Sequence, residues 1–72
     1  MDVFSVQVSG ILNSEQPFKG EFMVPACSEQ GALEQMHAEL DWSDAKRLHM
    51  TATLAHVEDI PEAAHHSIVR IH

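Results

Sequence analysis

Residues 27–42, CSEQGALEQMHAELDW, are the one stretch of this chain with clear helical periodicity. Ser28 is expected to cap the helix, because its hydroxyl can accept a hydrogen bond from an unpaired amide of the first turn. The spacing i, i+3, i+4, i+7 of a single helical face is met by Leu33, Met36, His37 and Leu40. We therefore predict one helix with a buried apolar face, and flanking segments that pack against it as strands.

Two segments before the helix alternate with the period of a half-buried strand. In residues 3–12, one side carries Phe4, Val6 and Val8. In residues 18–24, one side carries Phe18, Gly20, Phe22 and Val24. The polar residues 13–17 form a connection of hairpin length, and Pro25 is expected to end the second strand because it has no amide to donate. The two strands should pair antiparallel under the helix.

Residues 46–58 alternate again after the helix, and their apolar side consists of Leu48, Met50, Ala52 and Leu54. Because this segment follows a helix that follows the second strand, it can return parallel to the second strand and lie beside the first. We predict a single domain over residues 1–72 with an α+β fold, ββαβ(β). One helix packs on one face of a small antiparallel or mixed sheet of three to four strands, in the order 2-1-3.

The segment after residue 58 leaves more than one arrangement open. Residues 59–62 interrupt the third strand, residues 63–66 form a turn or one helical turn, and residues 67–71 suit a short fourth strand. Ile68, Val69 and Ile71 are too apolar for a free tail. We expect them to cover a sheet edge, either in the same chain or in a second copy, and the second arrangement would make a homodimer.

The net charge of the chain indicates which classes of partner it can bind. The chain has 72 residues, with eleven Asp and Glu against four Lys and Arg, for a formal charge of −7. Nucleic-acid binding depends on cationic surface, so direct DNA binding is not expected. The acidity has two explanations: it keeps a small protein dispersed in solution, or it meets a basic partner surface, in the extreme by imitating a nucleic acid.

The single cysteine, Cys27, excludes an intrachain disulfide framework and favours a reducing compartment. No apolar run approaches the roughly 20 residues of a membrane-spanning helix. MDVFSVQV at the start has an acid where a signal peptide has a basic region. We expect a cytoplasmic protein that does not interact with membranes.

We predict no catalytic residues, no metal site and no cofactor. The six histidines include no HExxH motif and no Cys/His spacing typical of zinc sites. An alternative is a weak transition-metal site formed by His65, His66 and His72. Cys27 precedes a helix N-terminus, where a thiol can be activated, but nothing pairs it with a particular histidine, and we expect a small residue that fills space at the turn.

The candidate site is a protein-binding surface at the outer side and exit of the helix, made of Glu34, Glu39, Asp41, Trp42 and Asp44. Trp42, the only tryptophan, is either a plug that closes the core or an exposed anchor of the kind that dominates interfaces. As an anchor with an acidic rim, it would suit a partner with a basic surface.

The succession VFSVQVSG, PFKGEFMVPA, ALEQMHAEL, a short polar turn and an alternating strand resembles the strand-strand-helix-strand unit of the archaeal ribosomal protein LX family and its eukaryotic relatives. The resemblance covers roughly residues 3–58. It implies the same arrangement of elements here, and a function in binding ribosomal RNA through basic residues after the helix. In that region this chain has Lys46 and Arg47.

The leading functional hypothesis is a non-enzymatic, acidic protein–protein interaction module that acts on a basic nucleic-acid-binding protein as an inhibitor or a nucleic-acid mimic. Small acidic α+β proteins of this size are similar in type to phage-encoded inhibitors such as anti-CRISPR proteins. The alternative is a small RNA-binding or ribosome-associated protein, as the family resemblance implies.

Overall fold

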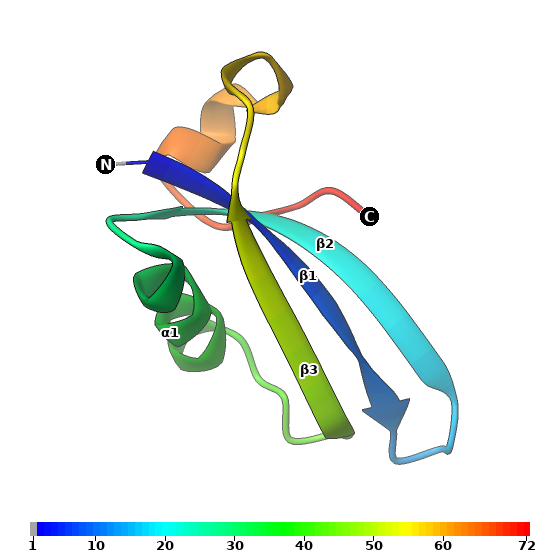
Figure 1. The fold of residues 1–72 in the computed structure, drawn as a ribbon. Coiled ribbons are helices and arrows are strands. Elements are labelled where there is room, and N and C mark those ends of the chain that lie inside the picture. The colour runs from blue at the N-terminus through cyan, green and yellow to red at the C-terminus, as the bar shows by residue number, and fades with distance from the viewer. Residues whose placement is uncertain (1) are drawn as a thin grey trace.

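The computed structural model describes residues 2–72 and contains one sheet, one α-helix and two short 3₁₀ helices. The strands are β1 (Asp2–Leu12), β2 (Pro17–Ala26), β3 (Ala45–Leu54) and β4 (Val69–Arg70). The helices are α1 (Glu29–Glu39), η1 (Val57–Asp59) and η2 (Glu62–His65). Neighbouring strands are antiparallel throughout, in the order β3-β1-β2-β4. Figure 1 shows β1 between β3 and β2. The predicted α+β class is confirmed, and the predicted order 2-1-3 is extended by a fourth strand beside β2.

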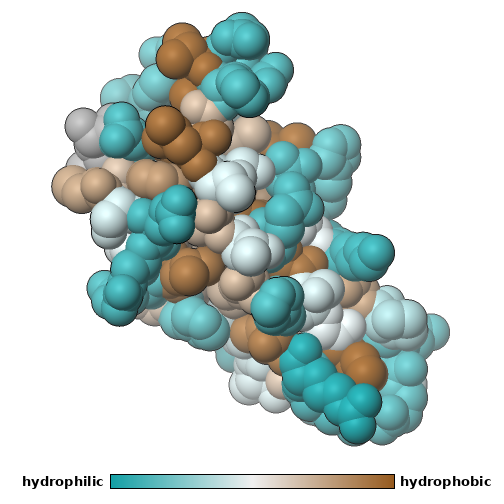
Figure 2. Space-filling model, in the orientation of Figure 1, coloured by the Kyte–Doolittle hydropathy of each residue, from teal (hydrophilic) through white to brown (hydrophobic). Residues whose placement is uncertain are grey.

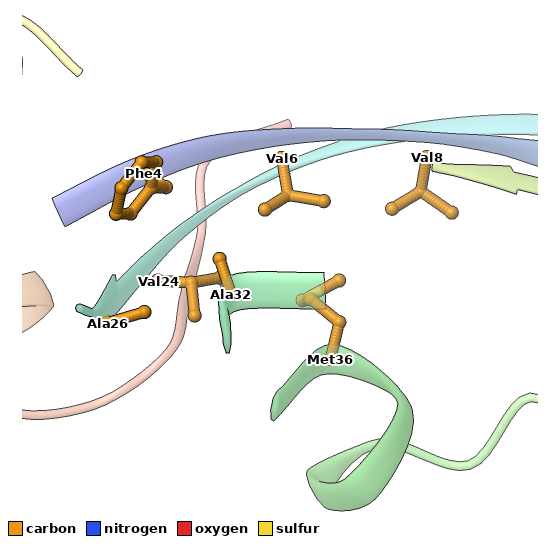
Figure 3. Packing of buried hydrophobic residues seen from close by; sticks show 7 residues of the cluster. All are labelled: Phe4, Val6, Val8, Val24, Ala26, Ala32 and Met36. Carbon is orange, nitrogen blue, oxygen red and sulfur yellow. The ribbon is translucent and has the colours of Figure 1, made fainter. Parts of the chain in front are cut away.

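The main core lies between the sheet and α1 (Figure 3). β1 contributes Phe4, Val6 and Val8 to this core, and all three are buried, as the alternation of residues 3–12 predicted. The buried members from β2 and α1 are Val24, Ala26, Ala32 and Met36. The alternation of β1 and β2 therefore places one apolar face of the hairpin under the helix, as predicted.

The helix begins as the sequence predicts. Ser28 has an extended backbone, and its hydroxyl oxygen accepts a hydrogen bond from the amide of Gly31 at 3.0 Å. At the second strand, the side-chain amide of Gln35 donates to the carbonyl of Pro25 at 2.8 Å. The cap fixes the start of the helix, and the Gln35 contact ties the middle of the helix to the end of β2.

The predicted extent and apolar face of the helix are partly wrong. The helix ends at Glu39, and the backbone of Leu40 is already extended (φ −119°, ψ 148°). His37 is exposed, and only Ala32 and Met36 are fully buried. The buried stripe is narrow because residues four apart lie nearly in line along a helix, whereas the next residue, at position 37, is turned about 100° away from Met36.

The second strand continues through Pro25, contrary to our prediction. Pro25 lies opposite Val3, and the carbonyl of Val3 accepts a hydrogen bond from Ala55 on the other side of β1. Because hydrogen-bonding directions alternate along an antiparallel strand, the nitrogen of Pro25 points away from β1. The missing amide therefore interrupts no bond between β1 and β2, and a proline is tolerated there.

The third strand ends at Leu54, four residues before the predicted end. The last backbone bond from this segment to β1 runs from Ala55 to Val3. Beyond this bond the chain leaves the sheet and enters η1, which ends the pairing. Near its start, the register shifts between Ser9 and Ile11, and Arg47 adopts a positive φ of 55°, which are the features of a β-bulge.

Most of the C-terminal segment packs on the opposite side of the sheet from α1, whereas Ile68 packs against the main core. It forms a second apolar cluster in which Val3, Met23 and Ala64 are buried. Its strand β4 pairs with β2 in the register Phe22↔Arg70 and Met23↔Val69. The expectation that this segment covers a sheet edge is confirmed within the same chain. Dimerisation through the segment stays a prediction.

Candidate functional site

The acidic residues of the predicted site are all exposed. Glu34 lies in the middle of α1 and Glu39 is its last residue, whereas Asp41 and Asp44 lie in the connection to β3. We call these four residues the acidic surface. The carboxylate of Asp41 accepts a hydrogen bond from the amide of Ser43 at 2.9 Å, and this bond lowers the pKa of Asp41 below its ordinary value. The turn after the helix therefore favours the charged form of this acid.

Trp42 is half-buried and belongs to the edge of the main core. Its indole nitrogen donates a hydrogen bond to the carbonyl of Met36 at 2.9 Å. Its ring meets that of Phe22 edge to face, with centroids 6.2 Å apart and an interplanar angle of 82°. On β4, the guanidinium of Arg70 lies 5.7 Å from the centroid of the Phe22 ring. Two alternatives were predicted for Trp42, a plug that closes the core and an exposed anchor. The packing of the indole agrees with the plug.

The acidic surface has no cation paired with it. Within residues 2–72, the ion pairs are Lys46 with Glu15 at 2.6 Å and a long contact of 3.9 Å between His72 and Glu21. The sequence between Lys19 and Lys46 contains six acids and neither lysine nor arginine. No ion pair among the described residues therefore neutralises the acidic surface, although Lys46 and Arg47 follow Asp44 by two and three residues.

A shallow groove runs along the outer side of α1, with a volume of about 630 Å³. It is lined by Glu29, Gln30, Leu33, Glu34, His37 and Ala38. Leu33 is half-buried, so part of this side chain contributes apolar surface between carboxylates. The groove was not expected from the sequence, because helical spacing assigned Leu33 and His37 to the buried face. The signal in the sequence that could have indicated the groove is the pair of acids at positions 29 and 34, both of which line it.

Three of the four lysine and arginine residues lie at the far end of the β1–β2 hairpin and the start of β3. Lys19 and Arg47 line a groove of about 480 Å³ over Gly10 and Phe18, while Lys46 is paired with Glu15. On the side in view in Figure 2, hydrophilic side chains surround small, separate apolar patches. Acids lie at this end as well, since Lys46 pairs with Glu15 and the backbone of Asp44 bonds to Asn13 in the hairpin loop.

Other polar groups meet on the face of the sheet away from α1. The Ser5 hydroxyl donates to the carboxylate of Glu21 at 3.0 Å, and the backbone of Glu21 bonds with both Ile71 and His72. These contacts fasten the C-terminal segment to the sheet. Cys27 is exposed, so our expectation that it fills space at the turn is wrong. The described residues bring no three His, Cys, Asp or Glu side chains together in an arrangement that could hold a metal ion.

The fold and the site together define a small α+β protein with an unneutralised acidic surface at the end of its helix. Its helices within residues 2–72 lack the length and apolar character needed to cross a membrane. No family model, no curated protein and no solved structure matches the chain. The similarity to the ribosomal protein LX family rests on the sequence pattern alone.

Proposed function

We propose that this protein is a non-enzymatic interaction module that uses its acidic surface to occupy the basic, nucleic-acid-binding surface of another protein. In this proposal it acts as a small inhibitor or nucleic-acid mimic, similar in type to anti-CRISPR proteins. The observation that carries the proposal is the absence, within the described residues, of any ion pair to Glu34, Glu39, Asp41 or Asp44. Their full charge is therefore available to a partner.

The surroundings of these acids support the proposal. Trp42 fixes the exit of the helix through its bond to Met36, so the carboxylates on either side are held on an ordered backbone. A surface that is ordered before binding loses less conformational entropy on association. The half-buried Leu33 in the adjacent groove adds apolar contact area, which charge alone does not supply.

We infer a cytoplasmic location, because the only cysteine is free and a basic nucleic-acid-binding partner would be met there. Direct DNA binding is not part of the proposal. The alternative function, RNA binding, would use the cations at the hairpin end, and Lys46 there is already paired with Glu15. Two further cations at that end are few for a nucleic-acid interface.

The test is an affinity capture from the lysate of the native host at low salt, performed with and without nuclease. The bait is compared with a variant that neutralises the acidic surface, E34Q/E39Q/D41N/D44N. A matched control, D2N/E58Q/D59N/E62Q, removes the same number of charges from exposed acids elsewhere. We expect a basic nucleic-acid-binding protein to be captured by the native chain and the control, to be lost with the first variant, and to be released by added DNA or RNA.

The two variants have the same net charge, so a general electrostatic attraction would weaken equally in both. Equal capture by both variants would refute a role for the acidic surface. Recovery of ribosomes or RNA only in the absence of nuclease would support the alternative function instead. Binding through the acidic surface should also weaken steeply as the salt concentration rises.

A further inference from the structure

The sheet has one long open edge, formed by β3. In the order β3-β1-β2-β4, β3 has a neighbour on only one side (Figure 1). The amide of Ala55 donates to Val3 of β1, and bonding directions alternate along an antiparallel strand. The backbone groups of Met50, Ala52 and Leu54 must therefore point away from β1. Within residues 2–72, the structure gives these outward groups no hydrogen-bond partner.

Only the first part of this edge has the usual protection against pairing. Charged side chains and bulges keep sheet edges from pairing, and here they occur together at Lys46 and Arg47. The following residues, 49–54, contain no proline, lysine, arginine or acid. Past the strand's centre, Leu54 is 61% exposed and Val57 is 83% exposed, and they are the large apolar residues most exposed in the described chain. The unprotected edge thus leads directly to exposed apolar side chains.

We propose that a second copy of this chain pairs with this edge, so that two β3 strands run antiparallel with Ala52 on the two-fold axis. A two-fold interface requires a patch that complements itself. With Ala52 at the centre, Met50 lies opposite Leu54 of the second copy, and Thr51 lies opposite Thr53. On the face toward α1, apolar side chains of the two copies therefore lie opposite each other. On the other face, threonine lies opposite threonine, and both kinds of cross-strand pair are favourable.

The charges beyond this segment favour a second copy over an unrelated peptide. Lys46 and Arg47 stand at one end of β3, and Glu58 and Asp59 lie in η1 beyond its other end. In Figure 1, η1 lies beyond the end of β3 along the direction of the strand. Antiparallel pairing directs the cations of each copy toward the acids of the other, and of these cations Lys46 also pairs with Glu15 of its own chain. Like charges are kept apart although each chain has a net charge of −7.

The resulting dimer has a continuous eight-stranded sheet in which β4 of each copy lies at an outer end. Both copies place α1 on the same face, because side chains of paired residues point to the same side of a sheet. One strand pair makes a small interface, so we expect a dissociation constant in the micromolar range. The pairing is independent of the function proposed for the acidic surface.

The test uses the exposed pair Thr51 and Thr53, whose side chains face away from α1. In the dimer each lies opposite the other, so T51K/T53K places lysine opposite lysine twice, whereas T51K/T53E places lysine opposite glutamate twice. Sedimentation equilibrium of the native chain should show a dimer forming as the protein concentration rises from about 10 µM to about 500 µM. This range includes the dissociation constant expected for the pairing. We expect T51K/T53K to weaken it by about tenfold or more and T51K/T53E to retain it.

A mixing experiment identifies the interface without depending on the strength of either homodimer. T51K/T53K and T51E/T53E should each be mostly monomeric and should form a heterodimer when mixed, because every lysine then meets a glutamate. Circular dichroism checks that each variant is folded. A native chain that stays monomeric throughout the concentration range would overturn the proposal. A dimer that is unchanged in both T51K/T53K and T51E/T53E would also overturn the proposal. That result would point to pairing through the C-terminal segment.

Discussion

The indole nitrogen of Trp42 donates a hydrogen bond to the carbonyl of Met36, 2.9 Å away, and so closes the last turn of α1. The same carbonyl also accepts from the amide of Leu40 at 3.3 Å. The carbonyl oxygen of Met36 thus accepts two hydrogen bonds, one from the backbone and one from the indole, which uses its second lone pair. One side chain thus ends the helix, extends the core and orients the connection to β3.

The first prediction concerns Trp42. Trp42→Ala removes both the hydrogen bond and the edge-to-face contact with Phe22, and we expect the free energy of unfolding to fall by about 2–3 kcal/mol. Trp42→Phe keeps a ring against Phe22, and Leu40 still donates to Met36, so a loss of about 0.5–1 kcal/mol is expected. Urea denaturation followed by circular dichroism measures both. A change of less than about 0.5 kcal/mol for Trp42→Ala would contradict the plug.

The second prediction compares two glycines of the hairpin. A Cβ at Gly10 would lie 3.0 Å from Cε1 of Phe18 and 3.2 Å from the carbonyl oxygen of Lys46, whereas at Gly20 its closest neighbour would be Cε1 of Phe22 at 3.3 Å. Gly10→Ala should therefore destabilise the protein by about 1–2 kcal/mol, because a backbone oxygen cannot move aside easily. Gly20→Ala is the matched control, with an expected cost below about 1 kcal/mol. Thermal unfolding of both variants tests whether Gly10→Ala is the more destabilising of the two. Equal losses of stability would contradict the prediction.

The third prediction concerns the core on the face away from α1. Ala64 is fully buried beside Val3 and Met23, whereas its neighbour Ala63 is exposed. Ala64→Asp should lower the free energy of unfolding by about 3 kcal/mol or more, because it buries a carboxyl group among apolar side chains. Ala63→Asp adds the same charge at the surface and should change the stability by less than about 0.5 kcal/mol. Equal urea midpoints for the two variants would show that η2 does not cover the sheet.

The fourth prediction concerns pH. The amide of Ser43 stabilises the charged form of Asp41, so the pKa of this carboxyl lies below its ordinary value of 3.8 in the folded protein. Its contribution to stability is therefore fully present above the unfolded pKa and is lost as the pH falls through the folded pKa. A side-chain NMR titration should give Asp41 a midpoint below that value. A midpoint at or above it would mean that the turn after α1 is not formed in solution.

Asp41→Asn is the matched variant for the pH prediction. The side-chain oxygen of asparagine can still accept from the amide of Ser43, but it does not titrate. We expect the variant to fold normally and to lose the part of the acid-induced destabilisation that comes from residue 41. Unfolding curves of both proteins between about pH 5 and about pH 2.5 measure the difference. Identical pH dependence would show that the hydrogen bond does not favour the charged form.

Signals within short segments of the sequence are enough to place the buried face of β1 and the start of α1. Alternation placed Phe4, Val6 and Val8 on the buried face of β1, and the hydroxyl of Ser28 marked the start of α1, because both signals depend on residues a few positions apart. The acidity of residues 20–45 was likewise visible from the composition. These features follow from strand period, capping chemistry and charge, and none of them requires a distant partner.

The ends of the elements and the contacts of their outer surfaces depend on segments that are distant in sequence. β3 stops at Leu54 because the chain turns away into η1 after the last bond to Val3, and Pro25 fits within β2 because its nitrogen points away from β1. Trp42 became part of the core because Phe22 and Met36 lie within its reach. The open edge of β3 likewise depends on strand order. Each is a relation between segments distant in sequence, which periodicity within one segment does not contain.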